Sequence, residues 1–232
     1  MLHLRSLFAV ACLAVFHVSF IVAAEPDAIE PFNGKDLTGW KLRNDNLEKN
    51  RWVVGTAKLA ENPSQLTVAA EGQELVNKAG GGVDVWSEQK FGDAVLEIEV
   101  MVPKGSNSGI YVMGEYEIQV LDSFGKEKVG PGDLGGLYGA SAPRVNASKA
   151  PGEWQKFLID YRAPRFDDQG KKTQNAVFVK ITLNDQVIHE NVEMKGPTPS
   201  GVTGKEAPTG PLMFQGDHGP VAYRNIKVKP FK

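Results

Sequence analysis

Cysteine is almost absent from this sequence, because its 232 residues contain only Cys12. One thiol cannot form an intramolecular disulfide, and a thiolate metal site needs several cysteines, so both are excluded. An excess of charge of one sign is also lacking: 26 Lys and Arg stand against 28 Asp and Glu, a formal net charge of -2. Because phosphate recognition needs clustered Lys and Arg, nucleic acid is not an expected partner.

The sequence also lacks an apolar run of membrane-spanning length. Residues 7–22 are almost entirely apolar, but this run of ~16 residues is shorter than the ~20 that a spanning helix needs. Arg5 precedes it and two small residues, Ala23 and Ala24, follow it, an order typical of a secretory signal peptide. We therefore expect cleavage after Ala24, a secreted or periplasmic protein, and no stable membrane insertion.

Removal of residues 1–24 would leave one domain, residues 25–232, with no cysteine and two histidines, His189 and His218. A cluster of three histidine ligands is then excluded. No internal repeat or domain boundary is visible, and 41% apolar content is enough for a sizeable core. Histidine chemistry therefore depends on these two residues.

Helical periodicity is missing from residues 25–232, and period-two alternation in short runs takes its place. Asn184 and Asp185 form a two-residue hairpin signal, because both residue types tolerate positive φ. The runs predicted as strands are Trp52–Ala60, Gln65–Val68, Ala94–Val102, Ile110–Met113, Tyr116–Leu121, Phe157–Tyr161, Val177–Leu183, Gln186–Asn191, Leu212–Gln215 and Val221–Lys229.

So many short strands without intervening helices cannot form a parallel α/β sheet. They predict an all-β fold in which two antiparallel sheets pack as a sandwich or jelly roll. Two long Gly-rich or Pro-rich connections, residues 124–150 and 196–211, are expected as loops, and loops of this length are often functional.

The run from Glu115 to Asp122 carries the most polar strand face. In a strand, Glu115, Glu117 and Gln119 share one side, which is either a solvated edge or a polar binding surface. Just before it, Asn107 lies in a Ser-rich and Gly-rich turn. That turn lacks the Gly-Lys-Ser/Thr ending of a phosphate loop and precedes a strand, so a nucleotide site is not expected there.

His218 lies in the Gly-rich segment Gln215–Pro220, where a neutral imidazole could act as an acid or a base, or could merely cap a backbone carbonyl. His189 lies in an alternating strand, and a place on the sheet surface is expected for it. Arg224 alternates to the same side as Ala222, Ile226 and Val228 and therefore needs a partner, either a carboxylate or a ligand.

Several short motifs, taken in order along the chain, resemble the 3-keto-disaccharide hydrolase family, also described as 3-keto-glucoside 1,2-lyase and 3-keto-2-hydroxy-glucal hydratase. This resemblance implies a concanavalin-A-like jelly roll with its site on the concave sheet, and a bacterial protein that is periplasmic or extracellular. The motifs are Phe32–Trp40, Ser106–Ile110, Tyr116–Asp122, Pro151–Trp154, Gln215–His218 and Tyr223–Ile226.

The chemistry that the resemblance implies needs a base for the C2 proton of a 3-keto sugar, a group that stabilises the enolate, and an acid for the leaving oxygen. By residue type we expect Glu117 and His218 as catalytic residues and Arg224 as the enolate partner. The side chains expected to bind substrate are Asn107, Gln119, Asp122, Gln215 and Arg224. No cofactor is implied; a divalent cation on the carboxylates stays open, although no spacing demands one.

Two alternatives remain open besides cleavage of 3-keto-glycosides. One is a non-catalytic, lectin-like carbohydrate-binding module on the same sandwich. The other is a glycosidase for unoxidised sugars, since Glu115 and Glu117 would lie ~7 Å apart on one strand face. One departure bears on specificity, because this chain has Met113 where relatives often carry Arg.

Overall fold

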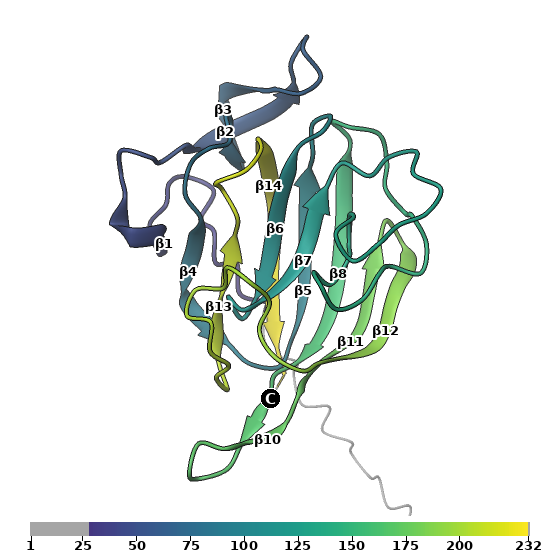
Figure 1. Cartoon of the computed structure of the whole chain (residues 1–232). Helices are drawn as coiled ribbons and strands as arrows, with labels where there is room; N and C mark the ends of the chain where they lie inside the picture. The colour runs from purple at the N-terminus through teal and green to yellow at the C-terminus, as the bar shows by residue number, and fades with distance from the viewer. Residues whose placement is uncertain (1–27, 232) are drawn as a thin grey trace, which may run out of the picture.

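Residues 28–231 are described by the structure, a computed structural model, and their regular structure is almost entirely β-strand (Figure 1). Arg43–Asp45, a short 3-10 turn, is the only helical element in this part of the chain. Within the same residues, no helix has the length and apolar character needed to cross a bilayer. The expected signal peptide, residues 1–24, lies outside the described residues.

The strands form two main antiparallel sheets and one small separate hairpin, which confirms the predicted all-β sandwich. The five-stranded sheet has the order β1 (Trp40–Leu42), β4 (Val85–Phe91), β13 (Gly210–Phe214), β6 (Asn107–Val112), β7 (Tyr116–Leu121). The seven-stranded sheet has the order β12 (Gln186–Met194), β11 (Ala176–Leu183), β8 (Trp154–Arg162), β5 (Ala94–Met101), β14 (Val221–Pro230), β3 (Leu66–Asn77), β2 (Trp52–Leu59). The hairpin pairs β9 (Arg165–Phe166) with β10 (Lys172–Gln174).

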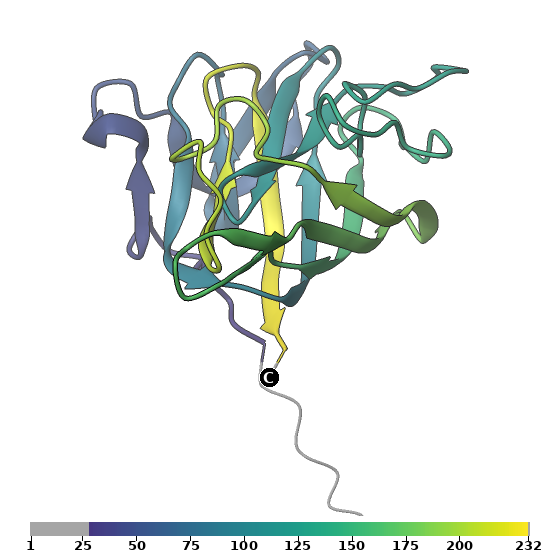
Figure 2. The ribbon, with the colours of Figure 1, turned by 60° about the horizontal axis from the view of Figure 1, so that its bottom comes forward.

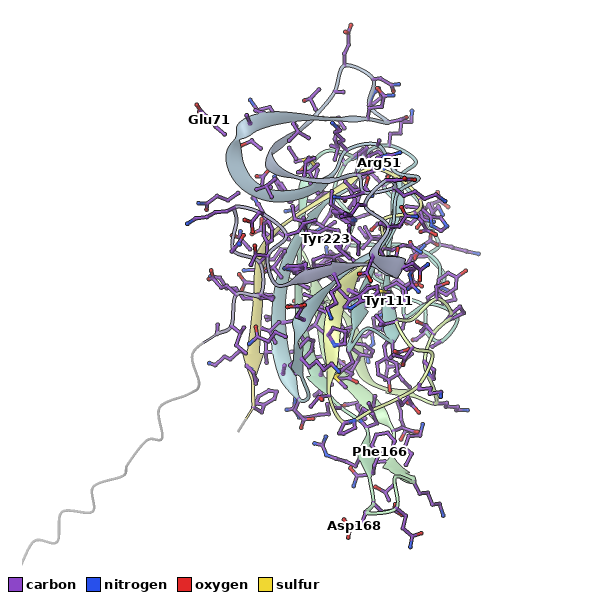
Figure 3. All side chains as sticks on the ribbon, turned by 90° about the vertical axis from the view of Figure 1, so that its left-hand side faces the viewer. Arg51, Glu71, Tyr111, Phe166, Asp168 and Tyr223 are labelled. Atoms are coloured by element: carbon purple, nitrogen blue, oxygen red, sulfur yellow. The ribbon has the colours of Figure 1, made fainter. Side chains whose placement is uncertain are left out.

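The main core lies between the two sheets, where alternate side chains of facing strands interdigitate. Tyr223 of β14 stacks on Phe214 of β13 across this space, with ring centroids 3.9 Å apart. Figure 3 shows Tyr223 between the sheets and Tyr111 on the far side of the five-stranded sheet. Each fully buried side chain of this size contributes ~1.5–3 kcal/mol to folding.

The two ends of the described chain lie together. Ile29 and Val228 form an antiparallel bridge, with N–H to O=C distances of 2.7 and 2.8 Å. Figure 2 shows β14 running down beside the first described residues. The last strand is therefore held in the seven-stranded sheet by the start of the domain.

The alternation predicted for β14 is wrong beyond Arg224. Asn225 has a φ of 50°, and the pairing with β5 shifts register between Arg224 and Lys227. This bulge inserts one residue and reverses the faces that follow, as bulges do. Ile226 and Val228 consequently face the core, whereas Arg224 points to the outer side of the sheet.

The remaining strand predictions are confirmed in part. Asn184 and Asp185 form the expected turn, with φ of 51° and 66°. The predicted loop 196–211 ends at Gly210, where β13 begins. Four strands were not predicted. β1, β9 and β10 have only two or three residues each, and β4 has three consecutive exposed residues, Glu88–Lys90, which hide the period of two.

His189 is buried rather than on the sheet surface. Only 2% of the residue is exposed, and its Nε2 lies 2.8 Å from the carbonyl oxygen of Gly135. Burial lowers the pKa of this imidazole, so His189 packs as a neutral side chain that holds the loop after β7.

Candidate functional site

The face of β7 that points away from the core carries two of the predicted site residues. Tyr116, Ile118 and Val120 pack into the core, so period-two alternation turns Glu117 and Gln119 outward. Both outward residues are nevertheless only 4% exposed. Their side chains are therefore covered on the outer face rather than solvated, which excludes a plain water-facing edge.

Two rows of outward side chains cross the neighbouring strands. In the first row, Glu117 of β7 lies opposite Tyr111 of β6, which lies opposite Met213 of β13. In the second row, Gln119 lies opposite Gly109, whose carbonyl accepts the backbone N–H of Gln215 at 3.0 Å. The register therefore brings three predicted residues from two distant segments to one patch.

Gly109 leaves room at the middle of this patch for the Glu117 carboxylate. A Cβ atom at position 109 would lie 2.5 Å from Glu117 Oε1 and 2.9 Å from the Tyr111 ring. No side chain fits there without moving both residues. The glycine is thus needed for a close approach and not for its backbone angle.

Glu117 has the electrostatics of a general base that works near neutral pH. Burial raises its pKa from an ordinary 4.5 to about 7, and the charges of Asp84 and Asp217 act in the same direction. The hydrogen bond with Tyr111 and the charge of His218 oppose this shift. A carboxyl that titrates near 7 can accept a proton and release it again in one reaction cycle.

Asn107 and two glutamine amides supply hydrogen-bonding groups around the same patch. Gln119 Nε2 donates to Asn107 Oδ1 at 3.1 Å. Gln215 Oε1 is buried and has no hydrogen-bond partner among the described residues. A buried acceptor without a partner costs free energy, so Gln215 is well suited to accept a hydrogen bond from a ligand hydroxyl.

The loop that contains His218 forms the rim of the patch. Gly219 N–H donates to the Asn107 carbonyl at 2.8 Å, which fixes the loop beside the start of β6. His218 is about half exposed, and its Nδ1 lies 2.5 Å from Asp217 Oδ1. The carboxylate orients the imidazole and leaves Nε2 as the nitrogen available to a ligand.

Glu115 is not part of the patch, although it was predicted to share a face with Glu117. Glu115 lies in the turn before β7, where its carboxylate accepts the N–H groups of Thr203 and Gly204 at 2.8 and 2.9 Å. It therefore anchors the segment from Thr198 to Glu206. A pair of free carboxyls of the kind that a glycosidase uses is not formed by Glu115 and Glu117.

Asp122 and Arg224 do not join the other predicted residues. Asp122 accepts the backbone N–H of Gly105 at 2.9 Å and holds the turn before β6. Arg224 lies on the outer side of the seven-stranded sheet, beside a polar groove of about 470 Å³, and pairs with Glu99 at 2.7 Å. The predicted enolate contact between Arg224 and the Glu117 site is not formed.

Two residues of the outer face, Tyr111 and Arg43, were not predicted from the sequence. Arg43 Nε contacts Asp84 at 2.7 Å, and its guanidinium lies 5.9 Å from the Trp86 ring centroid. Its Nη2 also donates to the Ser200 carbonyl at 2.8 Å. Tyr111 could have been predicted, because a hairpin that joins the two predicted strands pairs it with Glu117. The sequence around Arg43 contains no local pattern that indicates a site residue.

Met113 lies in the turn between β6 and β7, with a φ of 58° and 3% of the residue exposed. No group of three or more Asp, Glu, His or Cys side chains that could hold a metal ion occurs in residues 28–231. The candidate site therefore comprises Asn107, Tyr111, Glu117, Gln119 and Gln215, and His218 lies at its rim.

Comparison with known proteins agrees with this fold. A glycosyl hydrolase candidate from Parabacteroides distasonis, of known structure, is 28% identical, has a TM-score of 0.66, and aligns over 88% of this chain and 84% of its own. A second from the same organism is 19% identical, with a TM-score of 0.59 and coverage of 88% and 94%. The second likeness shows the fold alone.

A 3-keto-disaccharide hydrolase of Bacteroides thetaiotaomicron is 27% identical over 129 residues, which are 51% of this chain and 41% of that protein. The match thus spans about two fifths of the length of that relative. Residues 27–229 match the 3-keto-alpha-glucoside-1,2-lyase-like domain, nearly the whole of the described chain. This chain belongs to the 3-keto-alpha-glucoside-1,2-lyase-like domain family.

Proposed function

We propose that this protein is an exported enzyme that cleaves 3-keto-glycosides by elimination across C1 and C2 followed by hydration, with hydrolysis as the net result. Family membership and the name of the Bacteroides relative support a carbohydrate substrate and a hydrolase. One observation carries the proposed chemistry: Glu117 is buried on an outer sheet face among hydrogen-bonding side chains, with its pKa raised to about 7.

The first step needs a base for the proton on C2, which the C3 ketone makes acidic. Glu117 accepts this proton in the proposal, because its pKa matches a proton transfer near neutral pH. The enolate oxygen that forms at C3 needs a hydrogen-bond donor. In the proposal Tyr111 supplies it by turning its hydroxyl from the Pro199 carbonyl and Glu117 to the substrate, and burial keeps its phenol protonated by raising its pKa.

The second step breaks the C1–O bond, and its electron pair leaves with the oxygen. His218 at the rim gives a proton to that oxygen in the proposal, while the C3 ketone re-forms and the ring gains a C1=C2 double bond. Water then adds across the double bond: its hydroxide goes to C1, its remaining proton goes to His218, and the proton held by Glu117 returns to C2. The base and the acid are thereby both restored, and Gln119, Gln215 and Asn107 bind the sugar hydroxyls.

Turnover of a 3-keto-glucoside beside the unoxidised glucoside tests this proposal. The purified residues 25–232 should release the aglycone from the keto sugar only, because the unoxidised sugar has no acidic C2 proton. The assay is run with and without a chelator, and loss of activity with chelator would show that the reaction needs a divalent cation. Release from neither sugar would overturn the enzyme proposal and favour a carbohydrate-binding module.

A further inference from the structure

A groove of about 540 Å³ adjoins the candidate site beside β7, the edge strand of the five-stranded sheet. Its two walls are the chain at Tyr138–Ala140 and the chain from Glu193 to Pro199. Tyr138 is 40% exposed, so one face of its ring is open to a ligand in the groove. An aromatic ring and polar side chains that line one groove offer a ligand both an apolar face and hydrogen-bonding groups.

Glu117 is the residue at which the two walls of the groove meet. Its backbone N–H donates to Thr198 Oγ1 at 3.0 Å, and its carbonyl accepts the N–H of Tyr138 at 3.1 Å. The edge of β7 therefore changes partner at this one residue, from one wall to the other. The groove begins where the two partners separate.

A third contact links the groove to the proposed enolate donor. Tyr111 Oη donates to the carbonyl of Pro199 at 3.2 Å, so the wall that carries Pro199 reaches the first row of the site. Pro197 and Pro199 have no backbone N–H and cannot continue a strand ladder against the opposite wall. The two prolines therefore prevent this wall from pairing with the opposite wall, and the groove stays open between them.

We infer that this groove binds the second sugar ring, the leaving group, of a 3-keto-disaccharide, with Tyr138 as the platform under that ring. The inference rests on the proposed function, because it takes Glu117 as the base at the ring that is cleaved. Sugar rings present C–H groups to aromatic faces and hydroxyls to charged side chains. Tyr138 offers the face, and Glu193 and Lys195 offer polar atoms on the opposite wall.

Steady-state kinetics with two substrates of the same anomeric configuration tests the subsite. One is a 3-keto-disaccharide, and the other is the methyl 3-keto-glycoside, which has the reacting ring but no second ring. Tyr138→Ala should raise KM for the disaccharide about tenfold, the loss of one good aromatic contact, and leave that for the methyl glycoside within about twofold. Tyr138→Phe keeps the ring and should behave as wild type.

Phe124→Ala serves as a matched control, because Phe124 is 57% exposed but does not line the groove. It should change neither KM. Equal effects of Tyr138→Ala on both substrates, or none on either, would overturn the subsite while turnover by the wild type upholds the proposed function. Failure of the wild-type protein to cleave either substrate would overturn the proposed function and the subsite with it.

Discussion

Two glutamates on opposite outer faces of the sandwich show opposite electrostatics. Glu117 lies on the five-stranded sheet, and burial raises its pKa to about 7. Glu99 lies on the seven-stranded sheet, where burial also acts to raise its pKa, but the hydrogen bonds of Asn225 and Arg224 outweigh it and lower the pKa. The surroundings thus raise the pKa of one glutamate and lower the pKa of the other.

The difference separates a chemical role from a structural one. Arg224 contacts Glu99 at 2.7 Å and also lies 4.1 Å from the Trp154 ring centroid, so its charge is used within the protein. The charges that act on Glu117 include two aspartates, which disfavour its ionised form. A carboxyl that is buried without full compensation is a candidate for proton transfer, whereas a paired one is a candidate for stability.

The largest expected effect is on turnover. Glu117→Gln keeps the size and hydrogen-bonding capacity of the side chain but removes the base, so kcat for a 3-keto-glycoside should fall ~10²–10⁴-fold. Glu99→Gln is the matched control and should leave kcat within about twofold, because Glu99 lies on the other sheet. Equal losses in the two variants, measured by aglycone release, would contradict the contrast.

The pH dependence of stability should also distinguish the two carboxyls. Folded Glu117 holds its proton up to about pH 7 and unfolded Glu117 only to about 4.5, so its contribution to the free energy of unfolding falls as pH rises between these values. Glu117→Gln should therefore gain up to ~3 kcal/mol relative to wild type from pH 4.5 to 8.

Glu99 should show the reverse sign. Its lowered pKa means that its stabilising contribution is present above its ordinary pKa and is lost as pH falls through the folded-state pKa. Urea unfolding of Glu117→Gln, Glu99→Gln and wild type at several pH values gives both differences. A difference between Glu117→Gln and wild type that does not change with pH would show that Glu117 titrates normally.

Gly109→Ala tests whether the site depends on the gap under the Glu117 carboxylate. The added methyl group would lie 2.5 Å from Glu117 Oε1 and must displace it. A displacement of about 1 Å at a reacting group costs ~10²-fold in rate, so kcat should fall by that order. Gly132→Ala, at an open loop position outside the groove, gives a control for added methyl groups; a Gly109→Ala enzyme of wild-type kcat would contradict the packing argument.

Much of the site was predictable because it depends on local alternation. The pattern of β7 gave the direction of Glu117 and Gln119, and the loop composition selected His218 as an acid or base candidate, which the structure places at the rim. Asn107 and Gln215 were selected by chemical type, and strand register then brought them to the same patch. What the sequence could not reveal was burial, since acidic side chains on a strand usually face water.

Arg224 shows why other predictions failed. Its predicted face depended on an uninterrupted period of two, and one bulge residue, Asn225, reverses that period. Arg43 was missed for a different reason, because its partners Asp84 and Ser200 are distant in sequence. Long-range partners and single-residue bulges are set by tertiary packing, which no short sequence window contains.

Arg224→Met has the smallest expected effect, and it tests whether the outer face of the seven-stranded sheet has a structural role only. Methionine keeps the apolar stem over Trp154 but removes the partly exposed ion pair with Glu99, so stability should fall by ~1 kcal/mol or less, and the loss should shrink at high salt. Turnover should not change, because no described contact joins Arg224 to Glu117. A large fall in kcat with an unchanged free energy of unfolding would instead mean that the outer face of the seven-stranded sheet takes part in the reaction, and the separation between the two glutamates would no longer hold.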